Sequence, residues 1–254
     1  MKVRLDQLLL DRQFAADIEN ARAIIGAGEI YVNDRISDKA GKMYDLNVSI
    51  RKKEKCPYVS RGGLKLEKGL DHFNIKPENL RCVDIGASSG GFTDCLLQHN
   101  PEKIYAVDVA YGQLAWKIRQ DPRVVVLERF NARGITLKDI DNKPVDLAVI
   151  DVSFISLKKI IPCVAALFNK DIAILALIKP QFELKKEEVG IKGVVIQSHL
   201  HQKAIDKIAD FICDLGLSNN GTIASPLLGP KGNREFLMYI RSSKTTVYET
   251  KMTP

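Results

Sequence analysis

Two lysines and two acids of this chain stand where a folded protein would present them to a ligand. Asp151 and Lys179 each follow an apolar run typical of a buried strand, and Glu235 precedes another such run. A lysine that closes a buried strand is costly to desolvate without a purpose. Such an amine, oriented by acids, removes the proton of an alcohol as the alcohol attacks. The pattern indicates activation of a hydroxyl group by Lys65, Asp151, Lys179 and Glu235.

Each of these side chains also has a plain structural interpretation. Asp151 would cap a helix, Lys179 would extend its amine to solvent, and Glu235 would be a surface acid of an edge strand. Whether the four side chains lie together in the folded protein decides between these interpretations and the chemical one.

A loop of small residues lies between the apolar run Cys82–Ile85 and a predicted helix. Its glycines and serines let the backbone approach a ligand closely, and the helix that follows presents free amide groups. Asp108 closes the next predicted strand, where a nucleotide-binding unit places the acid that holds ribose hydroxyls. The predicted cofactor-binding residues are Asp84, Gly86, Ser88, Gly90, Gly91, Phe92 and Asp108.

The composition of this loop favours S-adenosylmethionine as the cofactor. The loop lacks the lysine of a phosphate-binding loop, and its glycine spacing does not match G-x-G-x-x-G. S-adenosylmethionine carries adenosine but no pyrophosphate, so its loop needs no lysine. A tight strand-to-helix turn without a ligand is the alternative, and the paired acid Asp108 argues against it.

Beyond about residue 80, predicted strands alternate with helices, as a doubly wound α/β sheet requires. Most of the apolar runs are apolar on both faces, as expected of parallel strands covered by helices. Open sheets of this kind bind ligands at the carboxyl ends of their strands, where the candidate residues stand. The predicted strands are Cys82–Ile85, Ile104–Val107, Val124–Leu127, Leu147–Ile150, Ile172–Ile178, Thr222–Ser225 and Phe236–Arg241.

The composition of the 254 residues is that of a folded protein, 45% hydrophobic and 27% charged. Five scattered cysteines argue against a disulfide framework, and the four histidines form no recognisable metal set, so no metal is expected. No leader is visible, and the longest apolar run, Ile172–Ile178, is too short to span a bilayer. We therefore expect a cytoplasmic protein with no membrane partner. The net charge of +7 points to a polyanionic partner.

The pattern of apolar residues in the first fifty positions differs from that in the rest of the chain. It predicts two short helices, each with one apolar face, followed by a hairpin. We expect three parts: an RNA-binding domain at 1–50, a basic linker at 51–58 and a methyltransferase domain at 59–254. Isolated arginines are usually surface residues, and a basic run is often a solvated linker. The candidates for RNA contact are Arg4, Arg22, Lys52, Lys53 and Arg61.

The N-terminal segment resembles the αL RNA-binding motif, which also occurs in a small-subunit ribosomal protein, pseudouridine synthases and tyrosyl-tRNA synthetases. The match lies in Arg4–Leu9 and Ala21–Asn33, with Lys39 beyond. The motif often has serine where this chain has Ala21. The resemblance implies that this part binds RNA.

The whole chain resembles the TlyA-type hemolysin family, a branch of the FtsJ-like ribose methyltransferases with a Rossmann-like fold. The family usually has Arg-Asp after the valines of Gly190–Gln197, and this chain does not. The resemblance implies the tetrad Lys65, Asp151, Lys179 and Glu235, S-adenosylmethionine as cofactor, and a cytidine 2′-hydroxyl of ribosomal RNA or ribosomal subunits as substrate. The matching pieces are Ser60–Leu66, Asp84–Thr93, Val107–Leu114, Asp151–Leu157, Ile178–Glu183 and Gly229–Phe236.

Ribose methylation therefore stands as the hypothesis, with Lys179 as the base, Asp151 orienting it, and Lys65 with Glu235 positioning the hydroxyl. The chain has no Asn/Asp-Pro-Pro-aromatic motif for base amines and no cysteine in a nucleophile motif. Two alternatives remain: a ribosome-binding protein without catalysis, and a membrane-active toxin. The toxin ranks last, because no spanning segment or strongly amphipathic basic helix occurs.

Overall fold

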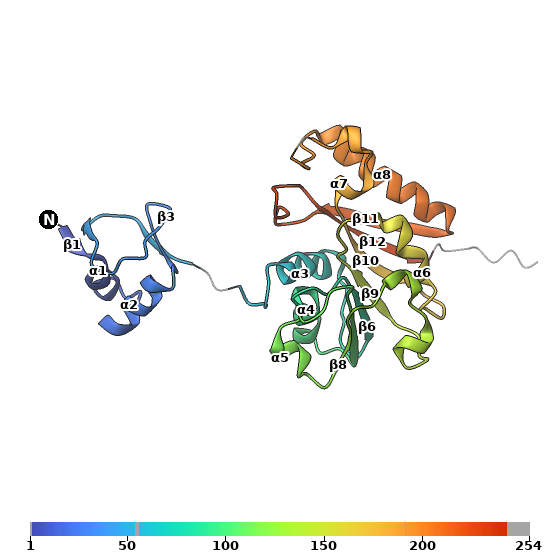
Figure 1. The fold of residues 1–254 in the computed structure, drawn as a ribbon, viewed down its shortest axis with the longest axis horizontal. Helices are drawn as coiled ribbons and strands as arrows, with labels where there is room; N and C mark the ends of the chain where they lie inside the picture. Colours follow the sequence, from blue (N-terminus) through green and yellow to red (C-terminus); the bar gives the residue numbers. More distant parts are fainter. Residues whose placement is uncertain (1, 54–55, 191, 243–254) are drawn as a thin grey trace, which may run out of the picture. The chain divides into compact units, whose positions relative to one another are not determined.

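The computed structural model describes residues 2–53, 56–190 and 192–242. The chain divides into two compact units, Met1–Lys55 and Cys56–Pro254 (Figure 1). Each unit has a hydrophobic core of its own. Among the described residues, no helix is long and apolar enough to cross a membrane.

The first unit packs two short helices against small antiparallel sheets. Leu5 and Leu9 of α1 and Ile25 of α2 are fully buried, and the side chain of Asp17 caps α2 by accepting from the Asn20 amide. Phe14 lies in the loop after α1, partly buried against the same core. The elements are β1 (Lys2–Arg4), α1 (Leu5–Asp11), α2 (Ile18–Gly26), β2 (Ile30–Val32), β3 (Arg35–Ile36), β4 (Met43–Asp45) and β5 (Ile50–Lys52).

The expected hairpin is present, and a further strand joins it. β2 pairs with β3 on one side and with β5 on the other, and β1 pairs separately with β4. Arg51 and Lys52 were expected in a linker, but they lie in β5, where they pair with Tyr31 and Ile30. The sequence does not distinguish the two, because a basic, solvent-facing edge strand has the same composition as a linker. Residues 54–55 of the expected linker are outside the described residues.

The second unit is built on a seven-stranded sheet in the order β11-β12-β10-β9-β6-β7-β8. Five strands are parallel, β12 runs antiparallel to β10, and β11 runs antiparallel to β12. The seven predicted strands and the α/β class are confirmed. The strands are β6 (Arg81–Ile85), β7 (Lys103–Val107), β8 (Val124–Leu127), β9 (Leu147–Ile150), β10 (Ala173–Ile178), β11 (Leu217–Ala224) and β12 (Phe236–Ser242).

β11 is longer than the sequence predicts. It begins at Leu217 instead of Thr222, and its pairing with β12 shifts register between Asn219 and Thr222. Asparagine and glycine are depleted in strands, so the bulged part carries no strand signal.

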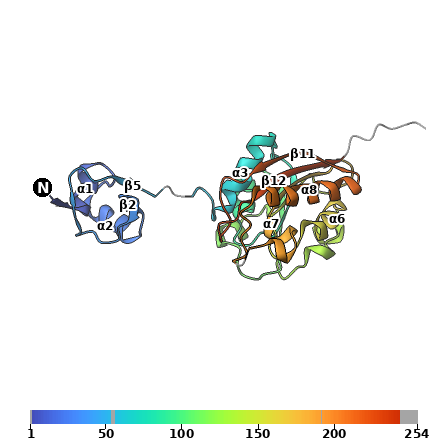
Figure 2. The ribbon, with the colours of Figure 1, turned by 90° about the horizontal axis from the view of Figure 1, so that it is seen from above.

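Helices cover both faces of this sheet (Figures 1 and 2). α3 and α4 pack on one face through Leu66, Leu70 and Leu96, and α6 and α8 pack on the other through Ile161 and Ile208. The α-helices are α3 (Gly62–Phe73), α4 (Gly91–Gln98), α5 (Trp116–Arg119), α6 (Ile161–Ala165), α7 (Pro180–Glu183) and α8 (Ser198–Asp214). The 3-10 helices are η1 (Ala132–Gly134), η2 (Leu137–Ile140), η3 (Leu157–Lys159) and η4 (Lys186–Glu188).

The strand order places a crevice beside the central strand β6. The chain proceeds from β6 to β7 and β8 on one side, and then returns to β9 on the other side of β6. Such a reversal separates the loops at the carboxyl ends of the two strands and leaves room for a ligand between them. The loops after β6, β9 and β10 lie at this edge.

Candidate active site

The loop after β6 is shaped by a close approach to the end of β9. Gly86 has φ +89°, and a Cβ at this position would collide with the backbone carbonyl of Asp151. Ser88 and Gly90 also have positive φ, and Gly90 is the N-cap of α4. The loop therefore keeps its backbone at the crevice, as the sequence predicts.

Asp108 and Asp84 have different surroundings. Asp108 accepts hydrogen bonds of 2.7 Å from the amides of Ser88 and Ala110, so it fixes the loop and lines the crevice. Asp84 is fully buried below the loop, where Oδ2 accepts from Thr93 at 2.6 Å and Oδ1 has no partner. Burial raises the pKa of Asp84 to about 7. Asp84 lines neither of the cavities described next, and its contact supports α4 from inside.

Two cavities meet at the loop. The first, about 280 Å³, is lined by Arg61, Lys65, Phe92, Lys179 and Glu235, and the second, about 470 Å³, by Asp108, Asn131 and Phe154 among others. Both are lined by Gly86, Ser88, Asp151 and Ser153. An elongated ligand can therefore extend from one cavity to the other across the loop.

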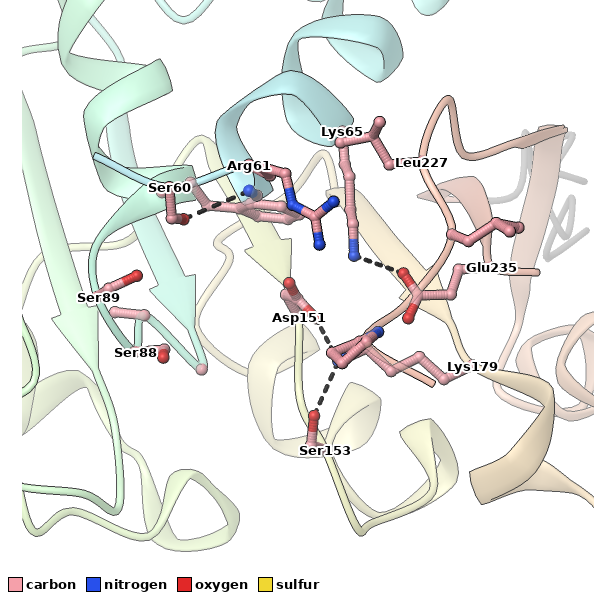
Figure 3. A pocket seen from close by; sticks show the side chains of 17 residues that line it. Ser60, Arg61, Lys65, Ser88, Ser89, Asp151, Ser153, Lys179, Leu227 and Glu235 are labelled. Carbon is pink, nitrogen blue, oxygen red and sulfur yellow. Dashed lines mark hydrogen bonds and ion pairs between the residues drawn. The ribbon is translucent and has the colours of Figure 1, made fainter. Parts of the chain in front are cut away.

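The four predicted catalytic side chains meet in the first cavity as two ion pairs (Figure 3). Lys65 Nζ lies 2.5 Å from Glu235 Oε2, and Lys179 Nζ lies 2.6 Å from Asp151 Oδ1. Lys179 also donates a 2.9 Å hydrogen bond to the hydroxyl of Ser153. All four side chains are at most one-fifth exposed. Paired charges in such a sheltered place interact more strongly than charges in water.

Local structure holds each of these residues in place. Lys65 is in the first turns of α3, whose Gly63 leaves room for the Tyr58 ring. Lys179 lies between the end of β10 and the start of α7, and Pro180 begins α7 with the fixed φ that suits a first helical residue. Glu235 precedes β12, and a side chain at Gly229 would strike its carboxylate.

Phe154 is a feature that the residue-by-residue sequence analysis did not single out. Its ring is 90% exposed, and its φ of +64° is rare for a bulky residue. The ring packs against Phe182 at 5.2 Å between centroids, at a further cavity of about 310 Å³ that Lys179 and Glu235 also line. A strained, exposed aromatic beside charged groups indicates a contact surface for a ligand. The sequence feature that could have identified Phe154 is an aromatic residue in the loop that follows a predicted strand.

A buried acid joins the loops that carry Lys179 and Asp151. Glu183 in α7 accepts from the Ser156 hydroxyl at 2.5 Å and from the Leu157 amide at 2.8 Å. Burial raises the pKa of Glu183. The loop after β9 is thereby fixed to the segment after β10.

The residues predicted to contact RNA have mixed surroundings. Arg4 and Arg22 both pair with the buried Asp6, at 2.7 Å and 3.2 Å, and remain about half exposed. The hydrogen bond from Arg4 lowers the pKa of Asp6 to about 2. Both arginines thus have an internal partner in addition to an accessible surface. The other three are Lys52 in β5, the exposed Lys53, and Arg61, which lines the first cavity.

The segment Gly190–Gln197, which departs from the family pattern, contacts the loop that carries Glu235. The Val195 amide donates to Asn233 Oδ1 at 2.8 Å, and the side chain of Asn233 donates to the Gly193 carbonyl at 2.8 Å. Asn233 thus ties this segment to the loop that carries Glu235. Ile191 is outside the described residues.

Comparison with known proteins agrees with this geometry. The FtsJ-like methyltransferase family matches residues 58–242. The chain belongs to the FtsJ-like methyltransferase family. The expected resemblance is thereby confirmed, and the chain is a methyltransferase. The match includes all four residues of the two ion pairs.

Relatives of this FtsJ-like methyltransferase cover nearly its whole length. It is 40% identical to the 16S/23S rRNA (cytidine-2′-O)-methyltransferase TlyA of Mycobacterium tuberculosis over 98% of this chain and 94% of that protein. A solved structure from Streptococcus thermophilus, whose protein carries a provisional hemolysin name, is 41% identical, with a TM-score of 0.75 over 96% of this chain and 89% of the other.

A more distant structure shows the fold alone. An S-adenosylmethionine-dependent methyltransferase from Listeria monocytogenes, also provisionally named, has a TM-score of 0.53 at 12% identity, over 72% of this chain and 99% of the other. The Rossmann-like methyltransferase fold predicted from the sequence is confirmed. These findings favour the methyltransferase over a non-catalytic RNA-binding protein and over a membrane-active hemolysin.

Proposed function

We propose that this protein methylates the 2′-hydroxyl of a cytidine ribose in ribosomal RNA, with S-adenosylmethionine as the donor. The observation that carries the proposal is the meeting of the ion pairs Lys65–Glu235 and Lys179–Asp151 in a cavity continuous with the glycine loop. The relative named TlyA supports the choice of substrate. We place the reaction in the cytoplasm, on ribosomal subunits.

The residues at the crevice fit the proposed cofactor. Gly86 leaves its backbone open to a ligand, and Asp108 lines the second cavity, where ribose hydroxyls would find a carboxylate acceptor. The first cavity would then receive the methionine part beside Asp151. When bound, S-adenosylmethionine supplies an activated methyl group on a positively charged sulfur.

Lys179 is the proposed general base. Its Nζ would accept the proton of the ribose hydroxyl as the oxygen forms its bond to the methyl carbon and the carbon–sulfur bond breaks. Asp151, 2.6 Å away, would orient the amine and face the positive sulfur. Lys65, held by Glu235, would position the hydroxyl for in-line transfer.

The exposed ring of Phe154 supports an RNA substrate. An enzyme that modifies one nucleotide takes it out of the stack and holds its base against aromatic side chains. Phe154 and Phe182 lie beside the cavity that contains Lys179. For the RNA-binding role proposed for the first unit, Arg4, Arg22, Lys52 and Lys53 remain the candidate contacts, with Arg61 near the catalytic cavity.

The test is transfer of a labelled methyl group from S-adenosylmethionine to small and large ribosomal subunits that lack their native modifications, followed by mapping of the label. The expected product is one cytidine whose 3′ linkage resists alkaline cleavage, because the 2′-oxygen is blocked. Label on a base would contradict ribose methylation. No cofactor binding in equilibrium titration would contradict the donor.

A further inference from the structure

A second group of chemically reactive side chains lies away from the catalytic cavity, between α3 and α4. Glu67 comes from α3, and Cys95 and His99 come from α4 and its C-cap. One ligand atom from each of these residues lies within 4.8 Å of the other two. The histidines were expected to form no metal set, and the structure instead brings His99 to a thiol and a carboxylate.

The placement of these residues is that of a metal site built on helices. Cys95 and His99 are four positions apart, so both lie on the face of α4 that meets α3. Glu67 approaches from the facing helix. A thiolate, an imidazole nitrogen and a carboxylate oxygen are the three ligand types that bind Zn²⁺, and three protein ligands leave one of its four positions for water.

The contacts of Glu67 are more numerous than hydrogen bonding accounts for. Its Oε2 lies 2.7 Å from the Tyr58 hydroxyl, 2.9 Å from His99 Nε2 and 3.2 Å from Cys95 Sγ. One carboxylate oxygen has two lone pairs, so it cannot accept from three donors at full strength. A cation at the centre of the group removes this conflict, because it displaces the proton of the thiol and binds the lone pair of Nε2, leaving the imidazole proton on Nδ1.

The distances are compatible with this arrangement. Metal–ligand bonds of about 2.0–2.3 Å in a tetrahedron separate neighbouring ligand atoms by about 3.3–3.6 Å. The observed 2.9 Å and 3.2 Å separations require shifts of only a few tenths of an ångström. Cys95 is fully buried, whereas Glu67 and His99 are about one-third exposed, so an ion can enter from their side.

Charge balance is compatible with a cation. A divalent ion would balance one carboxylate and one thiolate, and would stabilise both in their charged forms.

We propose that Glu67, Cys95 and His99 bind a zinc-class divalent cation that ties α3 to α4. Lys65 lies two residues before Glu67, and α4 begins at the cofactor loop. The bound ion would therefore fix the two helices that carry the catalytic lysine and the loop. It would play no part in methyl transfer.

The experiment uses the full-length, reduced protein after treatment with a chelator, with neither methyl donor nor RNA present. Zn²⁺ is titrated against a competing chromophoric chelator, and Co²⁺ is used as a spectroscopic substitute. We expect one equivalent of Zn²⁺ per chain, a rise in Tm, and the charge-transfer band of a cobalt–thiolate bond. Absence of stoichiometric Zn²⁺ binding would overturn the proposal, leaving the group as a hydrogen-bonded network.

Variants locate the ion. Cys95→Ala should abolish the charge-transfer band, and His99→Gln should weaken Zn²⁺ binding by more than about tenfold. Cys213→Ala and His199→Ala change exposed residues of the same types on α8 and should bind Zn²⁺ as the wild type does. His99 is partly exposed, so its variant keeps the test valid even if Cys95→Ala fails to fold. A cobalt–thiolate band that persists in Cys95→Ala, or is lost in Cys213→Ala, would place the ion elsewhere.

Discussion

Lys65 and Glu235 form a buried ion pair, with 2.5 Å between Nζ and Oε2, although 170 positions separate them in the chain. Lys179 and Asp151 form the second pair in the same cavity, each directly after one of two adjacent strands. The two acids differ in exposure, with 1% for the Glu235 side chain and 20% for Asp151. The first pair therefore forms a fixed wall of the cavity, whereas the second is open to a substrate.

Replacing Lys179 by alanine should separate catalysis from cofactor binding. Loss of a general base typically slows a reaction by about 10²–10⁴-fold. We expect a fall of this size in kcat for methyl transfer to ribosomal subunits, with an unchanged Kd for S-adenosylmethionine. Lys170→Ala, a change at an exposed lysine that lines none of the three cavities described above, is the control. Full activity of the Lys179 variant would remove this lysine from the mechanism.

Breaking the Lys65–Glu235 pair should cost stability as well as activity. Lys65→Met leaves the buried Glu235 carboxylate without its partner, and such a change costs about 3–5 kcal/mol. The double variant Lys65→Met/Glu235→Leu removes both charges, so it should regain much of that stability while remaining inactive. Urea denaturation of the three proteins measures the difference. A double variant no more stable than the single one would show that the unpaired charge is not the cause.

Asp84 should make stability depend on pH in an identifiable window. Its pKa of about 7 in the folded protein exceeds the ordinary value of 3.8, so between these values the folded state binds more protons than the unfolded state. The free energy of unfolding must then fall as pH rises from about 4 to about 7, by at most about 1.4 kcal/mol per pH unit.

The comparison for this prediction is Asp84→Asn, which has no charge to bury and keeps an acceptor for Thr93. Other groups titrate in the same window, and the difference between the two proteins cancels their contribution. We expect the wild type to lose stability relative to Asp84→Asn over the window. A difference that is independent of pH would contradict the raised pKa.

Phe154 should contribute to RNA binding and little to cofactor binding. Stacking of a base on an aromatic ring is worth about 1–3 kcal/mol. Phe154→Ala should therefore raise KM for the RNA by about 5–150-fold. Ile196→Ala, which truncates another highly exposed apolar residue, is the matched control. Phe154→Gly should lose the same RNA affinity but raise Tm relative to the alanine variant, since glycine relieves the strain of φ +64°.

The sequence predicts that Asp151, Lys179 and Glu235 lie close together because each stands beside a recognisable strand, and their catalytic role stays a prediction. Asp151, Lys179 and Glu235 adjoin strands that are apolar on both faces, and parallel strands bring their carboxyl ends to one edge of the sheet. The hypothesis pairs Lys179 with Asp151 and Lys65 with Glu235, but the sequence alone does not show which strands are neighbours. The order β9-β10-β12 decides that question.

Contacts between helices are harder to infer. Glu67 and His99 are unremarkable in sequence, and they meet only because α3 and α4 pack on the same face of the sheet. Arg4 and Arg22 were considered as RNA contacts or as surface residues, because a buried Asp6 that pairs with both depends on how α1 packs on α2. A single sequence does not show which side chains on different helices or strands come into contact.

The position of β12 between β10 and β11 has a consequence for how the protein is made. Among the described strands, β11 pairs with β12 alone, and β12 is the later of the two to be synthesised. While the chain emerges from the ribosome, β11 is therefore made before the strand with which it pairs, and Lys65 is made before Glu235. Insertion of one antiparallel strand, made after all the other strands of the sheet, closes the sheet and completes the charge network in a single step.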